Sequence, residues 1–151
     1  MLLNPDFKDM LSALSAAKID FLVVGAYAVA AHGHPRATGD LDLWVRAEPN
    51  TALRVLKVLA EFGAPLHDLT VEDLSTPGIV FQIGVEPSRI DILTSVSGVD
   101  FDSAWKNRIS LEMDGLTLPI IGREELIANK LACGRPKDIA DATALDANQE
   151  N

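Results

Sequence analysis

The stretch PRATGDLDLWVR, Pro35 to Arg46, places two aspartates inside an otherwise apolar strand pattern. Leu41 separates Asp40 from Asp42. Because successive side chains of a strand point to opposite faces of its sheet, the two aspartates share one face. Neighbouring carboxylates repel each other. Such a pair is tolerated when water surrounds it, when one acid keeps its proton, or when a cation binds between the two acids.

The composition is that of a globular chain. The 151 residues have the usual length of one domain, so we expect residues 1–151 to form a single unit whose tail frays from about residue 146. No apolar run is long enough to cross a bilayer, and the start MLLNPDFKDM has no signal-peptide pattern. The sequence therefore predicts a cytoplasmic protein without a membrane partner.

The cysteine and histidine content argues against disulfide bonds and structural zinc sites. One cysteine, Cys133, excludes an internal disulfide, and three scattered histidines make a structural zinc site a poor expectation. Cys133 follows apolar residues near the end of a predicted helix, which favours a packing role over a nucleophilic one.

The net charge of -9 limits the classes of partner. Proteins that follow a long phosphate backbone normally present a basic face, so the charge disfavours extended nucleic acid as a partner, although an RNA end stays open. A small nucleotide is compatible with this charge, because magnesium and one or two local cations can neutralise its phosphates.

Hydrophobic periodicity predicts an α/β (α+β) fold with a small mixed sheet and helices mainly on one face. Asn50 is the expected cap of a helix ending at Gly63, whose buried stripe would hold Leu53, Leu56 and Leu59 or Ala60. The other expected helices are 5–18, 26–33, a short one capped by Asp100, and two within 123–145 that are separated by Gly134 and Pro136. The expected single strands are 21–25 and 40–45. Two hairpins are expected as well: 79–85 with 89–94, and one within 109–120 that turns at Asp114-Gly115.

Three acids then fall on two predicted strands. Asp40 and Asp42 follow a strand, a glycine turn and a short helix, and Asp91 lies on a later strand, in RIDIL. Carboxylates from neighbouring strands can hold two metal ions, which stabilise the attacking and leaving oxygens of an in-line phosphoryl displacement. Magnesium, or manganese in its place, prefers such oxygen ligands.

The segment VVGAYAVAAHGHPRATGDLDLWV resembles the signature of the nucleotidyltransferase superfamily, which has the DNA polymerase beta-like fold. In that signature an apolar residue precedes Gly and then Gly or Ser, and after a spacer comes Asp, apolar, Asp, apolar. PRATGDLDL and the late KLACGRPKDIADATAL are similar in style to the small bacterial AbiEii-like enzymes of toxin-antitoxin and abortive-infection systems. The likeness spans Phe21 to Leu145.

The resemblance implies roles for individual residues. Asp40, Asp42 and Asp91 would be the catalytic acids and the metal ligands. The nucleotide would contact the turn at Gly25 and Ala26. It would also contact three further residues: Arg36, Thr38 and Lys130. Ala26 departs from the usual Gly or Ser, so that position offers the phosphates its backbone N–H and no hydroxyl.

Each of the cationic and late acidic residues also has a plainer explanation. Arg36 and Thr38 would be ordinary loop residues, and Lys130 would be a solvated helix residue. Lys137, Asp138 and Asp141 would form a charged helix surface in place of the family's late Asp-x-x-Asp motif.

The function expected from the resemblance is transfer of a nucleoside monophosphate from a nucleoside triphosphate such as ATP to a hydroxyl group. The acceptor would be a protein side chain, an RNA end or a small molecule, and a cognate antitoxin would be a further partner. A rival hypothesis is a catalytically inactive binding or regulatory module, which Ala26 favours. A third is a structural domain with an acidic edge strand.

Overall fold

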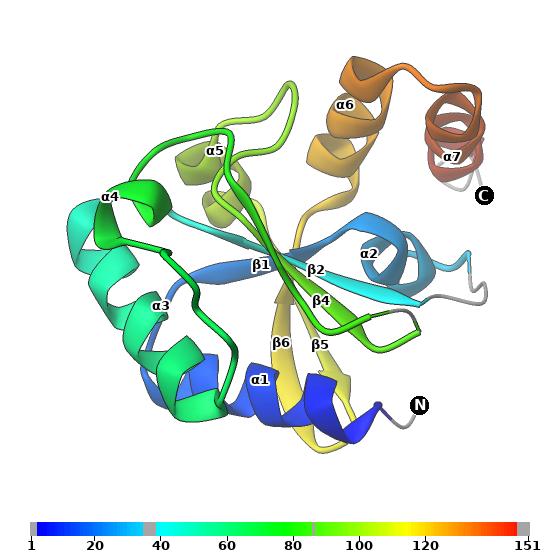
Figure 1. The fold of residues 1–151 in the computed structure, drawn as a ribbon. Helices are drawn as coiled ribbons and strands as arrows, with labels where there is room; N and C mark the ends of the chain where they lie inside the picture. Colours follow the sequence, from blue (N-terminus) through cyan, green and yellow to red (C-terminus); the bar gives the residue numbers. More distant parts are fainter. Residues whose placement is uncertain (1–2, 35–38, 86, 148–151) are drawn as a thin grey trace.

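The computed structural model describes residues 3–34, 39–85 and 87–147 (Figure 1). Its elements follow in the order α1 (Pro5–Ala16), β1 (Phe21–Val24), α2 (Gly25–Ala31), β2 (Asp40–Val45), α3 (Pro49–Phe62), α4 (Val71–Leu74), β3 (Val80–Ile83), β4 (Arg89–Leu93), α5 (Phe101–Lys106), β5 (Ile109–Met113), β6 (Leu116–Ile120), α6 (Arg123–Cys133) and α7 (Pro136–Ala147). Over these ranges, no helix is both long and apolar enough to cross a membrane.

The strands form one mixed sheet in the order β3-β4-β2-β1-β6-β5. The pairs β2–β4 and β1–β6 are parallel, and the other three neighbouring pairs are antiparallel. Both predicted hairpins form, as β3–β4 and β5–β6. The β5–β6 turn uses Asp114 at φ 51° and Gly115 at φ 80°, as a primed two-residue turn requires. The predicted fold class is therefore confirmed.

One face of the central strands is closed by the hydrophobic core. Leu41 and Leu43 of β2 and Ile90 and Ile92 of β4 are at most 1% exposed. Each such burial stabilises the fold by about 1.5–3 kcal/mol. Helix α1 lies below the strands in Figure 1, whereas α6 and α7 lie above them. Since side chains alternate along a strand, the opposite face of β2 and β4 carries the acids.

Helix α3 departs from the prediction at its start and in its buried face. It begins at Pro49, with Glu48 as the preceding residue in place of the expected Asn50 cap, because proline suits the first turn of a helix. The predicted leucine stripe is wrong at Leu53, which is 59% exposed, whereas Leu59 is buried as predicted and Leu56 packs against the core. The buried residues are Thr51, Ala52, Val55, Val58 and Leu59. Small residues allow a close approach to the core, which a search for leucines does not detect.

Candidate active site

The register of β2 against β4 brings the three predicted acids onto one face. Asp42 lies directly opposite Asp91, and Asp40 lies opposite Arg89. Because residues two apart on a strand share a face, all four side chains point to the same side of the sheet. Asp91 is 7% exposed, so the acids lie in a partly desolvated setting.

Arg89 connects two of these acids. Its Nη2 donates to Oδ2 of Asp40 at 2.6 Å, and its Nε donates to Oδ1 of Asp91 at 3.0 Å. A second contact, from Nη2 to Oδ2 of Asp91, measures 3.3 Å. The guanidinium thus neutralises part of the carboxylate charge. We had not predicted this arginine as a site residue, although its spacing of two from Asp91 was a usable signal.

Asp42 is neutralised in another way. Burial, a hydrogen bond with Asp91 and the negative charges of Asp91 and Asp40 together raise the pKa of Asp42 to about 7, against the opposing effect of Arg89. Two carboxylates hydrogen-bond to each other only if one carries a proton. Without a cation, Asp42 therefore keeps its proton up to about pH 7.

Gly25 is required by its closeness to Asp42. Strand β1 pairs with β2 so that Val24 lies opposite Asp42, and the chain then turns into α2. Gly25 has φ 67°, and a Cβ at this position would lie 2.2 Å from Oδ2 of Asp42. Any other residue would strain the backbone and collide with the carboxylate. The glycine of the motif therefore leaves space for the acid.

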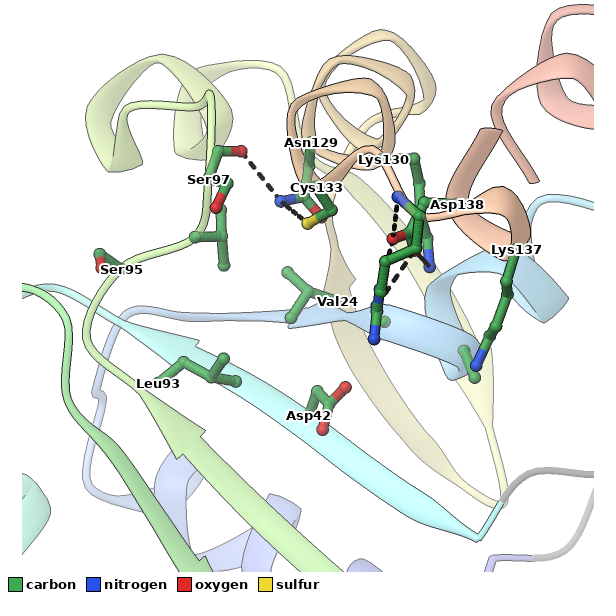
Figure 2. A pocket seen from close by; sticks show the side chains of 14 residues that line it. Val24, Asp42, Leu93, Ser95, Ser97, Asn129, Lys130, Cys133, Lys137 and Asp138 are labelled. Carbon is green, nitrogen blue, oxygen red and sulfur yellow. Dashed lines mark hydrogen bonds and ion pairs between the residues drawn. The ribbon is translucent and has the colours of Figure 1, made fainter. Parts of the chain in front are cut away.

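A cavity of about 280 Å³ opens above Asp42, between the sheet and α6 (Figure 2). Of the predicted site residues, it brings together Gly25, Ala26, Asp42 and Lys130, whereas Asp40 and Asp91 lie beside it on the sheet. The lining residues that we had not predicted as site residues are Val24, Leu93, Ser95, Val96, Ser97, Asn129, Cys133, Arg135, Lys137 and Asp138. Most come from the loop after β4, where no motif is visible in one sequence, and from the α6–α7 junction, where the late Asp-x-x-Asp motif that includes Asp138 was the available signal.

Lys130 is buried in a cluster of charges between α6 and α7. It is 7% exposed, and its Nζ lies 3.1 Å from Oδ2 of Asp141 and 3.5 Å from Oδ1 of Asp138. Arg135 donates to Asp138 from Nε at 2.6 Å and from Nη2 at 3.1 Å. These hydrogen bonds from Arg135, together with its charge and that of Lys130, lower the pKa of Asp138.

The solvated-surface explanation of this segment is therefore wrong for three residues. Lys130, Asp138 and Asp141 are each at most 7% exposed. The two carboxylates fix the cation because breaking a buried ion pair leaves an uncompensated charge. The cluster holds α7 against α6 and keeps Lys130 at the cavity wall.

The remaining predictions concern two residues of the 35–38 segment, the single cysteine and a loop histidine. Arg36 and Thr38 lie outside the described residues. Cys133 is exposed at the cavity, so the predicted packing role was wrong: the last turn of α6 turns it outward. His32 follows α2, and its Nε2 lies 2.8 Å from the backbone oxygen of Ile121, which ties this loop histidine to the end of β6.

The acids have the donor chemistry of a divalent cation site, but they are not arranged as finished ligands. Within the described ranges, no group of three or more His, Cys, Asp or Glu side chains has a geometry ready to hold a metal ion. Arg89 spans Asp40 and Asp91, and Asp42 keeps a proton up to about pH 7. A metal that bound Asp40, Asp42 and Asp91 would replace that proton and displace the guanidinium, and three carboxylate ligands fit magnesium or manganese.

Two solved structures share this fold. One is the protein TM1012 of Thermotoga maritima, described as a candidate nucleotidyltransferase, with a TM-score of 0.62, 17% identity, and coverage of 100% of this chain and 97% of that chain. The other is the lincosamide antibiotic adenylyltransferase LnuA with lincomycin bound, with a TM-score of 0.62, 14% identity, and coverage of 96% and 97%. At these identities the likeness establishes the fold alone.

Comparison of sequences adds the family. No curated protein matches the chain. A family model described as "Nucleotidyl transferase of unknown function (DUF2204)" matches residues 4–149, which include β1, the glycine turn, all three acids and the α6–α7 charge cluster. The chain therefore belongs to this family of nucleotidyl transferases.

Proposed function

We propose that the protein is a metal-dependent nucleotidyltransferase, which moves a nucleoside monophosphate from a nucleoside triphosphate to a hydroxyl acceptor. One observation carries the proposal: Asp42 lies opposite Asp91 on adjacent parallel strands, with Asp40 on the same face. Membership of the nucleotidyl transferase family supports it. A purely structural sheet gains nothing from three crowded, partly buried carboxylates.

Each of the three acids would have its own role in the reaction. Asp40 and Asp42 would hold magnesium or manganese, with Asp91 completing the ligand set. When bound, the metal would supply positive charge to the triphosphate and to the attacking oxygen. Asp91 accepts the proton of the acceptor hydroxyl, whose oxygen forms a bond to the α-phosphorus as the bond to the β-phosphate oxygen breaks and pyrophosphate leaves. No covalent enzyme intermediate is needed.

The cavity accounts for binding of a triphosphate by an acidic protein. Three cations line it: Lys130, Arg135 and Lys137. Asp138 positions Lys130 and Arg135 through its ion pairs, so these two cations are held in place at the cavity. At the Gly25–Ala26 turn, the backbone can approach the phosphates closely because neither residue carries a long side chain.

The acceptor and the biological role form the finer part of the proposal. LnuA is named for adenylyl transfer to a lincosamide antibiotic, which makes a small-molecule hydroxyl one acceptor class to test. The likeness to AbiEii-like enzymes supports a protein or RNA-end acceptor in a toxin-antitoxin or phage-defence system, with ATP or another nucleoside triphosphate as donor and a cognate antitoxin as partner.

A transfer assay tests the proposal. The full chain is incubated with magnesium or manganese and each labelled nucleoside triphosphate, with protein, RNA and small-molecule pools as acceptors. Label should appear in one pool for the wild type and fall by orders of magnitude for Asp91→Asn, with nucleotide binding retained. Binding without transfer to any pool would favour the inactive module instead, and a failure to bind any nucleotide would refute both.

A further inference from the structure

The cavity above Asp42 has two chemically different ends. Figure 2 shows Ser95 and Ser97 on one side of Asp42 and Lys137 on the other, with Lys130 and Asp138 toward the Lys137 side. All of them line the cavity. Phosphates prefer the cationic end, so a bound nucleoside triphosphate would direct its nucleoside toward the neutral, serine-lined end.

Asn129 of α6 provides the only side-chain amide among the described lining residues, and it lies at the neutral end. Its Nδ2 donates to the backbone oxygen of Ser97 at 2.9 Å and lies 3.8 Å from Sγ of Cys133. A backbone carbonyl can only accept a hydrogen bond, so this contact fixes which amide atom is the nitrogen.

The remaining atom of that amide is an acceptor. Asn129 is 8% exposed, and both of its hydrogen bonds within the described chain come from Nδ2. Its Oδ1 is therefore held at the cavity wall with no described donor. A ligand that covers a largely buried acceptor without supplying a donor binds more weakly, because the acceptor loses its contact with water. A ligand that brings an N–H to this oxygen is favoured over one that does not.

We propose that Asn129 selects nucleobases carrying an exocyclic amino group. Its Oδ1 accepts a hydrogen bond from the 6-amino group of adenine, the 4-amino group of cytosine or the 2-amino group of guanine, and uracil and hypoxanthine offer no such group. Ser97 is a positioning residue, because its backbone oxygen holds the amide in this orientation. The inference rests on the proposed function, since it takes the cavity as the nucleotide pocket.

Calorimetry of the full chain with magnesium, without an acceptor, tests this with matched nucleotides. ATP and purine riboside triphosphate differ only in the 6-amino group, GTP and ITP only in the 2-amino group, and CTP and pyrimidin-2-one riboside triphosphate only in the 4-amino group. At least one amino-bearing member should bind about tenfold more tightly than its partner, as a hydrogen bond of about 1.4 kcal/mol requires. In Asn129→Leu, which has a similar volume and no acceptor, that ratio should fall to about one, through weaker binding of the amino-bearing nucleotide.

The possible results distinguish a failure of the base selection by Asn129 from a failure of the proposed nucleotidyl transfer. Equal affinities within all three pairs for the wild type would overturn the selection by Asn129 without requiring any variant to fold. A ratio that persists in Asn129→Leu would assign the selection to another group and overturn it as well. If the wild type bound none of these six nucleotides and did not bind UTP, the proposed function itself would fail.

Discussion

Replacing Gly25 with alanine tests the close approach of the glycine turn to Asp42. The new Cβ would lie 2.2 Å from Oδ2 and 3.0 Å from Cγ of Asp42, far inside van der Waals contact. A side chain at φ 67° costs about 1–2 kcal/mol for the left-handed backbone. Displacing a partly buried carboxylate adds an overpacking cost of about 1–3 kcal/mol. Gly25→Ala should therefore lower the free energy of unfolding by about 2–5 kcal/mol.

Urea unfolding of the metal-free protein measures this loss, and Gly115→Ala is the matched control. Gly115 has φ 80°, and a Cβ there meets nothing within 4 Å, so this variant carries the backbone cost alone. The excess loss in Gly25→Ala is the cost of the contact with Asp42. Adding Asp42→Ala should recover most of that excess, since it removes Oδ2 and Cγ. Equal losses in the two glycine variants would refute the close approach.

Three further outcomes concern charges at the site. In protein freed of metal with a chelator, the free energy of unfolding should fall as pH rises from 3.8 to about 7, because only the folded state keeps the proton of Asp42 over this range. Urea midpoints measured against pH should show this decrease in the wild type and a smaller decrease in Asp42→Asn. Arg89→Met should raise manganese affinity in calorimetry and lower metal-free stability, since the guanidinium no longer neutralises Asp91; unchanged affinity would show that it does not compete. Lys130→Met should cost about 3–5 kcal/mol of unfolding free energy in urea, as expected for a broken buried ion pair, and a loss below about 1 kcal/mol would contradict the buried cluster.

The order of the strands along the chain could be predicted because each strand carries a local sequence signal. Asp114-Gly115 suits a primed turn, and the structure has positive φ at both positions. Alternation in RIDIL places Ile90 and Ile92 on one face and Asp91 on the other, which the burial of both isoleucines agrees with. The spatial neighbourhood of β2 and β4 has no local signal, because a parallel pair is joined by a long crossover. That neighbourhood came from the family resemblance.

The surroundings of the acids were not predictable from one sequence. Whether an arginine turns toward solvent or toward carboxylates depends on the neighbouring strand, and Asp40 is 49 residues from Arg89 along the chain. Lys130 lies on a helix with charged residues on several sides, and only the packing of α7 against α6 decides that it is buried. Asn129 likewise acquires its orientation from Ser97, 32 residues earlier. Long-range contacts of this kind leave no periodic pattern.

The two aspartates that share β2 are accommodated without a cation by two reversible devices. Asp42 keeps its proton up to about pH 7, and Arg89 bridges Asp91 to Asp40. Neither device is an efficient way to stabilise a fold, since apolar residues of similar volume would often do as well or better in place of buried charges. Both can be undone by a divalent cation, which takes the place of a proton and of a guanidinium together. A strand that only packed against the core would be more stable with apolar residues than with acids neutralised in this reversible way. The retention of the acids therefore favours the metal-dependent proposal over the inactive module.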